Sequence, residues 1–337
     1  MSPRLGVALA PEGPLDELVA TAAAAERLGY DSVWVNDDRL QKDLFGVLAA
    51  MAGATSTVRL GPGVTNPYSR HPALLAAAIA TLDELSGGRA VLGLGAGGTN
   101  HRALGIERRA PATALREAIT VVRGLLAGDE VTLDGTVVSA RHARLDFTPA
   151  RASVPIYVGA RGPKMLRTAG ELADGVIIGN LASPAGWRRA LAHVQAGCVG
   201  PAPALTAWVA CAVDPDGAAA RDAVRPMVAT SLVTSRAVLP ELGITAPSAF
   251  VRAMDRHGWS TERDAVRAAG ADLPAETIAE FAIAGTPAEC RERAAALLAE
   301  VPAIGELVLL PFPVPGRSPV ELLRRFSEDV MEVTGVG

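Results

Sequence analysis

Three segments of this 337-residue chain combine glycine, and in two of them proline, with polar or charged side chains at the end of an apolar run. They are residues 61–72, 92–100 and 156–164. In each segment the apolar run predicts a strand, and the residues that follow predict the start of a helix. Repeating β/α folds place their ligand sites at such strand-to-helix junctions. We therefore expect these segments to carry the chemistry of the protein.

The segment from Gly159 to Lys164 has the composition of a phosphate-binding site. Backbone N–H groups at a helix N-terminus are free, and the helix dipole is positive there. Gly159 and Gly162 allow a ligand to approach the backbone, and Pro163 suits a first helical turn. Arg161 and Lys164 can add positive charge. An ordinary turn between a strand and a helix is the alternative interpretation.

Carboxyl groups crowd the end of the second predicted strand, at Asp37 and Asp38, and another follows the first strand at Glu12. One of these acids can orient a cofactor ring or move a proton. The alternative is structural: Asp37 or Asp38 caps the following turn, and Glu12 favours the dipole of the next helix.

Residues 93–98 contain four glycines and resemble part of a dinucleotide fingerprint. No acidic ribose partner stands at the expected distance, so we reject a Rossmann fold. In a barrel the same glycines allow a flat cofactor to lie close to the backbone, with Thr99 and Asn100 as hydrogen-bonding groups. Tight packing at the strand end is the competing explanation.

Composition excludes several classes of function. The chain has 32 basic and 36 acidic residues and no basic run, which argues against a nucleic-acid partner. Its three widely spaced cysteines suggest neither a disulfide framework nor a zinc site, and no hydrolase or zinc-enzyme motif is present. The N-terminus lacks the regions of a signal peptide, and no apolar segment is long enough to span a bilayer. We expect a soluble, cytoplasmic protein without a metal ion.

Apolar runs alternate along the chain with alanine-rich segments of helical period, which predicts βα units around a parallel sheet. Eight strands are expected, the number that a closed barrel requires. Two insertions interrupt the pattern: a hairpin with an Asp-Gly turn near residues 129–147, and helices near residues 230–283. Asp214 and Thr286 each precede a proline and are predicted helix caps. We expect one domain over residues 1–337.

Taken together, these residues resemble the luciferase-like flavin and deazaflavin oxidoreductases, in the coenzyme F420-dependent branch that includes methylenetetrahydromethanopterin reductase. The resemblance is carried from the first strand to the last by residues 61–67, 81–89, 93–97, 159–166, 173–176 and 284–290. It implies a (β/α)8 TIM barrel with insertions that binds a deazaflavin at the carboxyl ends of the strands. It also implies a cis peptide bond between Gly63 and Val64 that backs the cofactor ring, and a homodimer or larger homo-oligomer.

The resemblance places the phosphate-bearing tail of the cofactor on residues 159–165 and its ribityl region against Gly97, Gly98 and Thr99. The residues expected to bind the cofactor are Gly63, Val64, Thr65, Asn66, Gly95, Gly97, Gly98, Thr99, Gly159, Ala160, Arg161, Gly162, Pro163 and Lys164. Relatives often carry a histidine where this chain has Asp37 and Asp38, and the methylenetetrahydromethanopterin reductases carry an acid where it has Gly98 and Thr99. These departures leave the proton-handling group and the substrate open.

Three functional hypotheses follow. The first is hydride transfer between C5 of F420 and a C=N, C=C or C=O carbon of a small organic substrate, with Asp37, Asp38 or Glu12 handling the proton. Asn66 and Tyr68 can orient the ring or the substrate. The second is an FMN-dependent monooxygenase, which activates oxygen on the reduced flavin. The third is a barrel that binds a cofactor without catalysis.

Overall fold

A parallel barrel forms the centre of the molecule in the computed structural model, which describes residues 3–37, 40–97 and 100–331. Hydrogen bonds join its strands in the order β3-β2-β1-β11-β9-β8-β7-β4, and single bridges from Leu60 to Ala90 and from Thr65 to Leu94 join β3 to β4. The predicted (β/α)8 barrel is therefore confirmed. The eight strands are β1 Arg4–Leu9, β2 Ser32–Val35, β3 Arg59–Pro62, β4 Leu92–Leu94, β7 Ile156–Gly159, β8 Gly175–Gly179, β9 Ala204–Val213 and β11 Ile304–Pro311.

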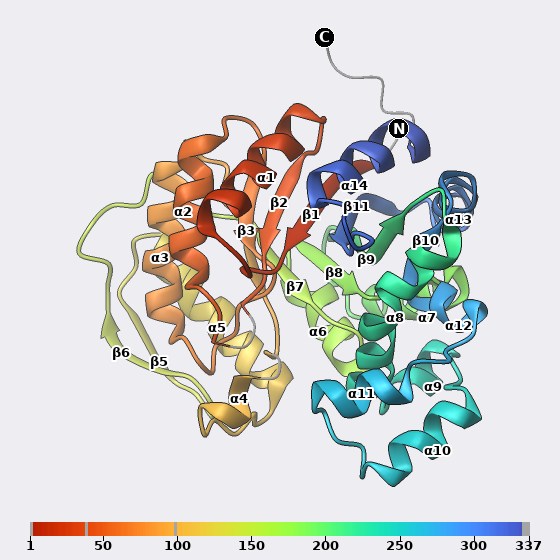
Figure 1. Ribbon diagram of the computed structural model, residues 1–337. Helices are drawn as coiled ribbons and strands as arrows, with labels where there is room; N and C mark the ends of the chain where they lie inside the picture. Colours follow the sequence, from red (N-terminus) through yellow and green to blue (C-terminus); the bar gives the residue numbers. More distant parts are fainter. Residues whose placement is uncertain (1–2, 38–39, 98–99, 332–337) are drawn as a thin grey trace.

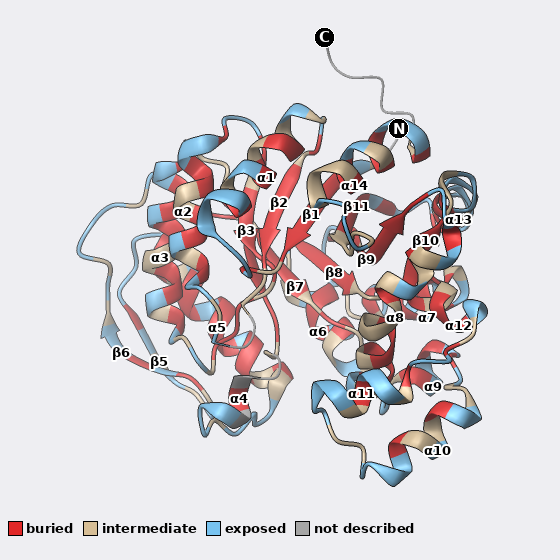
Figure 2. Cartoon of the chain, viewed as in Figure 1, coloured by how far each residue is buried: buried red, intermediate tan, exposed pale blue. Residues whose placement is uncertain are grey.

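Helices cover the outside of the barrel. Figure 1 shows α1, α2 and α3 on one side of the strands and α8, α13 and α14 on the other. In Figure 2 the helices are buried where they face the strands and exposed where they face outward, the pattern of an amphipathic helix. The helices are α1 Leu15–Arg27, α2 Leu44–Ala54, α3 Pro72–Leu85, α4 Asn100–Ala103, α5 Pro111–Leu126, α6 Pro163–Leu172, α7 Pro184–Gln195, α8 Gly217–Thr234, α9 Leu239–Leu242, α10 Ser248–Arg256, α11 Arg263–Ala269, α12 Ala275–Phe281, α13 Pro287–Glu300, α14 Pro319–Arg325 and the π-helix η1 Phe326–Val330.

The strands are almost continuously buried because helices cover one face and the barrel lumen lies against the other. Aromatic rings fill the lumen. The ring of Trp34 lies 5.7 Å from that of Tyr157 and 6.4 Å from that of Trp208, measured between centroids. At the amino-terminal end, the fully buried carboxylate of Glu306 pairs with Arg59 at 2.9 Å and accepts a hydrogen bond from Ser32 at 2.6 Å. The lumen is thus a packed core. A ligand can therefore bind only at the mouth, the end of the barrel where the carboxyl ends of the strands lie.

A hairpin, β5 Val131–Asp134 paired with β6 Ser139–Ala143, lies outside the barrel. Because Asp134 pairs with Ser139, its loop has four residues and is not the predicted two-residue Asp-Gly turn. The reason is the carboxylate of Glu117 on α5, which accepts hydrogen bonds from the backbone N–H groups of residues 136, 137 and 138 at 2.7–2.9 Å. A tertiary contact therefore selects the wider loop.

The second departure from the βα pattern, between β9 and β11, contains α8 to α12. It ends in a short strand that was not predicted, β10 Ala282–Gly285, which pairs in parallel with the end of β9. Figure 1 shows α10 and α11 at the lower edge of this side. The insertion thus returns to the sheet before the last helix and strand are formed.

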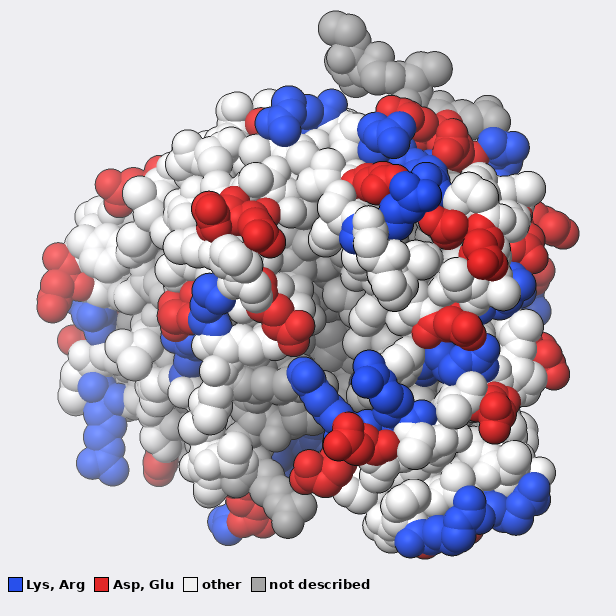
Figure 3. Space-filling view, in the orientation of Figure 1, with Lys and Arg blue, Asp and Glu red and all other residues white. Residues whose placement is uncertain are grey.

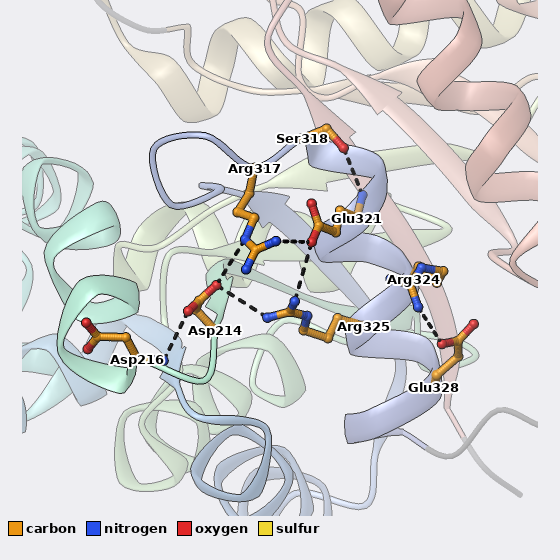
Figure 4. A network of polar contacts seen from close by, with 8 residues as sticks. All are labelled: Asp214, Asp216, Arg317, Ser318, Glu321, Arg324, Arg325 and Glu328. Carbon is orange, nitrogen blue, oxygen red and sulfur yellow. Dashed lines mark hydrogen bonds and ion pairs between the residues drawn. The ribbon is translucent and has the colours of Figure 1, made fainter.

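Asp214 does not cap α8, contrary to the prediction. Asp216 does so, by accepting hydrogen bonds from the N–H groups of residues 218 and 219. The carboxylate of Asp214 is turned toward α14 instead, where it pairs with Arg325 at 3.3 Å and Arg317 at 3.6 Å (Figure 4). Thr286 caps α13 in a complete capping box, as predicted.

None of the helices in the described ranges is long and apolar enough to cross a membrane.

Candidate active site at the barrel mouth

The three glycine-rich loops meet around one side chain, that of Val64. The peptide bond between Gly63 and Val64 is cis, as the resemblance implied, and Val64 follows it at the end of β3. A Cβ atom on Gly95 would lie 2.5 Å from a methyl carbon of Val64, and a Cβ atom on Gly159 would lie 3.1 Å from one. A side chain at position 95 or 159 would crowd Val64. Glycine at these two positions therefore allows the loops after β3, β4 and β7 to pack against each other.

Other glycines of these segments serve strand packing. A Cβ atom on Gly61 would lie 2.1 Å from the carbonyl oxygen of Val91, and one on Gly93 would lie 2.1 Å from that of Pro62. The close approach of β3 and β4 accounts for both. The sequence left two explanations for Gly93, contact with a cofactor and tight packing at the strand end. The structure shows the packing. Gly98 and Thr99 lie outside the described residues.

Asp37 lies at the mouth near the cis peptide bond that precedes Val64. The hydroxyl of Thr65 donates a hydrogen bond to its carboxylate at 2.6 Å, and the guanidinium of Arg70 lies at 3.5 Å. Arg70 also pairs with Asp43, which caps α2, at 2.5 Å. Asp37 is therefore held as a member of an ion-pair network. Asp38 lies outside the described residues.

Asn66 holds the loop that follows β3 through hydrogen bonds to its backbone. Its side-chain oxygen accepts hydrogen bonds from the N–H groups of Tyr68 at 3.1 Å and Ser69 at 2.9 Å, and it lies 3.2 Å from Nε2 of His101. Gly97 is packed against the same histidine, because a Cβ atom there would lie 2.1 Å from its ring. The oxygen of Asn66 is thus engaged within the protein, and its predicted contact with the cofactor can use only the amide nitrogen.

His101 is a buried histidine to which the sequence assigned no role. Since an amide oxygen only accepts, Nε2 carries the proton in its contact with Asn66. Burial lowers the pKa of the imidazole, and the nearby charge of Arg108 lowers it further, while Asp37 acts in the opposite direction. The ring is therefore neutral at pH 7, and His101 packs edge-on against Tyr68 at 5.4 Å.

His71, noted in the sequence for its place between candidate residues, is a helix cap. Its Nδ1 accepts a hydrogen bond from the N–H of Ala73 at 3.2 Å, in the first turn of α3. Its Nε2 donates to the carbonyl of Ser139 at 2.9 Å and so ties the hairpin to the barrel.

The segment predicted to bind phosphate runs from the end of a strand to the start of a helix. β7 ends at Gly159 and α6 begins at Pro163, so the first turn of a ten-residue helix follows directly. Arg161 lies between them, donates a hydrogen bond to the hydroxyl of Ser235 at 2.5 Å, and makes no ion pair with a carboxylate of the described residues. Burial lowers the pKa of Arg161. Arg161 is half-buried, and a cation without a carboxylate partner beside a helix N-terminus fits an anionic ligand group. Lys164 is exposed.

Glu12 lies on the opposite side of the mouth. Its carboxylate is 58% exposed, accepts a hydrogen bond from Nε2 of Gln41 at 2.7 Å and faces Arg263 of α11 at 3.6 Å. The amino group of Lys42 donates to the carbonyl of Gly13. These contacts join the loop after β1 to the segment after β2. Glu12 is therefore mostly exposed, unlike the partly buried carboxyl that the proton-transfer hypothesis needs.

A cleft of about 1120 Å³ opens on this side. Its walls come from the carboxyl ends of β1, β2 and β11 and from α1, α8 and α11. Figure 3 shows the surface hollowed between the side of α1 and the side of α8 and α11, with acidic and basic side chains on the rims. Asn36, next to Asp37 in sequence, lines the cleft.

The mouth is thus divided between two groups of strands. The loops after β3, β4 and β7 hold Val64 and Arg161, whereas the cleft belongs to β1, β2 and β11. Of the predicted acids, Glu12 lines the cleft. Gln41, Arg263 and Ser235 were not predicted. Ser235 is 74 positions from Arg161 in the chain, so no local motif could have pointed to it.

A family model described as luciferase-like monooxygenase matches residues 1–303. The chain belongs to this family. The match confirms the resemblance, because it covers seven of the eight barrel strands, all except β11, and the three glycine-rich loops of the mouth.

Members similar to this chain include oxidoreductases of known name. The 5,10-methylenetetrahydromethanopterin reductase of Methanolobus tindarius is 36% identical over 299 residues, which cover 87% of this chain and 90% of the relative. The F420-dependent glucose-6-phosphate dehydrogenase of Microbacterium testaceum is 38% identical over 178 residues, 49% of this chain and 52% of the relative. Among solved structures, the coenzyme F420-dependent tetrahydromethanopterin reductase from Methanopyrus kandleri superposes with a TM-score of 0.82 at 28% identity, covering 98% of this chain and 99% of the other.

Proposed function

We propose that this protein is a coenzyme F420-dependent oxidoreductase, acting as a reductase on a small organic substrate. The observation that carries the proposal is Arg161, a half-buried guanidinium beside the N-terminus of α6 that no described carboxylate balances. F420 carries a phosphate in its tail, and a phosphate at this place would supply the missing negative charge. Relatives named as F420-dependent support the same cofactor.

When bound, F420 supplies the hydride chemistry at C5, with a C=N, C=C or C=O carbon of the substrate as partner. The protein aligns the two reacting carbons and excludes water. Val64, held between Gly95 and Gly159, gives the cofactor half of the mouth a rigid surface. Arg161 and the first turn of α6 bind the tail.

Proton transfer by Asp37, Asp38 or Glu12 is part of the proposal. Asp37 has the partly buried setting that such a group needs, with 17% of its side chain exposed, whereas Glu12 is mostly exposed. Thr65 and Arg70 orient Asp37. Of Asp37 and Glu12, we therefore propose Asp37 as the group that transfers the proton. A cytoplasmic homodimer or larger homo-oligomer stays a prediction.

The test is a titration of the purified protein with F420 and, separately, with FMN, followed by quenching of cofactor fluorescence. We expect binding of F420 and none of FMN. The reverse result would make the protein an FMN-dependent monooxygenase, since a reduced flavin activates oxygen and a deazaflavin does not readily do so. If the protein bound neither F420 nor FMN, the hypothesis of a non-catalytic barrel would be favoured.

A further inference from the structure

The turn that follows α8 packs against the segment proposed to bind the cofactor tail, residues 159–164. Ser235, at the start of the turn, accepts the hydrogen bond of Arg161 at 2.5 Å. Val238, at its end, lies against Gly162, where a Cβ atom would be 3.2 Å from a methyl carbon of the valine. The N–H of Val238 donates to the carbonyl of Ser235 at 2.7 Å and closes the turn. The insertion between β9 and β11 therefore contacts the tail segment at two successive residues.

Arg236, between these two contacts, is held by an aromatic ring of the same insertion. Its side chain is exposed, and its guanidinium lies over the ring of Trp259, 3.7 Å from the ring centroid. A cation–π contact of this kind is favourable even at the surface. Because Arg236 follows Ser235 directly in the turn, the contact restrains the backbone that carries the partner of Arg161.

Trp259 is itself firmly held. Its φ is 54°, in the left-handed region that residues with bulky side chains rarely adopt. Its indole N–H donates to the carboxylate of Asp255 at 2.8 Å, and its ring packs edge-on against the buried Phe250, with 6.4 Å between centroids. An unusual backbone conformation persists only where surrounding contacts maintain it. The ring of Trp259 is therefore fixed in one orientation, with Arg236 on its face.

We propose that Trp259 and Arg236 are positioning residues for the cofactor tail. They act through Ser235, which holds the guanidinium of Arg161 in one orientation. This inference rests on the proposed function and adds residues of the insertion to it. Without the contact between Arg236 and Trp259 the turn is less restrained, so the phosphate has to order the guanidinium of Arg161 as it binds. That ordering lowers the affinity for the cofactor.

A comparison of two ligands tests the inference. The first is F420, and the second is 7,8-didemethyl-8-hydroxy-5-deazariboflavin, the part of F420 that ends at the ribityl chain and lacks the phosphate. The dissociation constants of both are measured by quenching of ligand fluorescence. Their ratio isolates the contribution of the tail, because the two ligands share the ring and the ribityl chain. For the wild type we expect F420 to bind more tightly.

Arg236→Ala should weaken F420 binding about two- to fivefold, the change that corresponds to loss of an exposed cation–π contact. It should leave binding of the phosphate-free ligand unchanged. Trp259→Ala should have the same effects, although it removes no charge. Trp259→Phe keeps an aromatic face and should restore most of the F420 affinity. Arg252→Ala is the matched control, because Arg252 is exposed on α10 of the same insertion; it should bind both ligands as the wild type does.

A double variant tests the route through Ser235. In Ser235→Ala the hydrogen bond to Arg161 is already lost. Adding Trp259→Ala should then cause no further loss of F420 affinity, whereas residues that act independently give additive losses.

Three results would each overturn the inference: F420 binding unchanged in both Arg236→Ala and Trp259→Ala, additive losses in the double variant, or an equal loss of affinity for the two ligands in Arg236→Ala. The last result would mean that the contact only stabilises the fold. The proposed function fails by a different result, namely that the wild-type protein binds neither ligand, so the two failures can be told apart.

Discussion

At the scale of single residues, removal of the Arg161 charge should weaken ligand binding without lowering stability. Arg161→Ala should weaken F420 binding about tenfold to a hundredfold, because a charge-assisted contact with the phosphate is lost. The free energy of unfolding should be unchanged or slightly higher, since the variant no longer holds a half-buried cation without a carboxylate partner. Fluorescence titration and urea unfolding measure the two effects.

Arg167→Ala serves as the control for that substitution, because Arg167 lies on the exposed face of the same helix, α6. It should leave F420 binding unchanged. If both variants bound F420 like the wild type, the phosphate would have to lie elsewhere.

The contact between Gly95 and Val64 can be tested by compensation. Gly95→Ala places a Cβ atom 2.5 Å from a methyl carbon of Val64, so the variant should lose about 1–3 kcal/mol of unfolding free energy. Adding Val64→Ala removes the clash and should recover part of that loss, a coupling measurable by a double-mutant cycle. Gly53→Ala, on α2 with open space around it, should be neutral or stabilising. Additive effects of the two mouth substitutions would argue against direct contact.

At the scale of elements, α1 holds the segment before β3 through one carboxylate. Glu26 accepts hydrogen bonds from the N–H groups of Ser56, Thr57 and Val58 at 2.8–3.1 Å. Burial opposes ionisation, but these bonds, chiefly those of Thr57 and Val58, lower the pKa of Glu26 to about 2 from 4.5. Because the folded pKa is the lower one, this stabilisation is complete above pH 4.5 and is lost as the pH falls toward 2.

Glu26→Gln should therefore be less stable than the wild type at pH 7, by about 1 kcal/mol for a partly exposed group. The difference should shrink as the pH falls from about 4.5 to about 2. Urea unfolding at a series of pH values measures it. A difference that stayed constant over this range would mean that the charge of Glu26 is not what holds the segment.

Elements were predictable where local pattern decides them. The strands and the cap at Thr286 follow from apolar runs and from a proline in the first turn, and the structure agrees. The loop of the hairpin and the role of Asp214 were wrong because distant partners decide them, Glu117 in one case and Arg325 in the other. The same holds for the site. The local sequence pointed to Gly159, whereas Ser235, the partner of Arg161, is 74 positions away and could not be predicted from it.

At the scale of the whole molecule, the network around Asp214 fastens α14 to the end of β9. Glu321 completes it, at 2.8 Å from Arg317 and 3.4 Å from Arg325. Asp214→Ala leaves two guanidinium groups, one of them largely buried, with a single carboxylate, so the variant should lose about 2–3 kcal/mol of unfolding free energy. Asp216→Ala removes only a helix cap and should lose about 1 kcal/mol. A smaller loss for Asp214→Ala than for Asp216→Ala would contradict this ranking.

The division of the mouth between two groups of strands separates two kinds of change along the chain. The loops proposed to hold the cofactor lie within residues 63–164, whereas the cleft is built from residues 8–41 and 219–319. Exchange of residues 8–21 with those of another family member should therefore change the cleft while F420 affinity is retained, whereas exchange of the insertion also replaces Ser235, the partner of Arg161, and should change both. The two sides of the mouth are joined by the contacts of Asp37 with Thr65 and of Arg161 with Ser235.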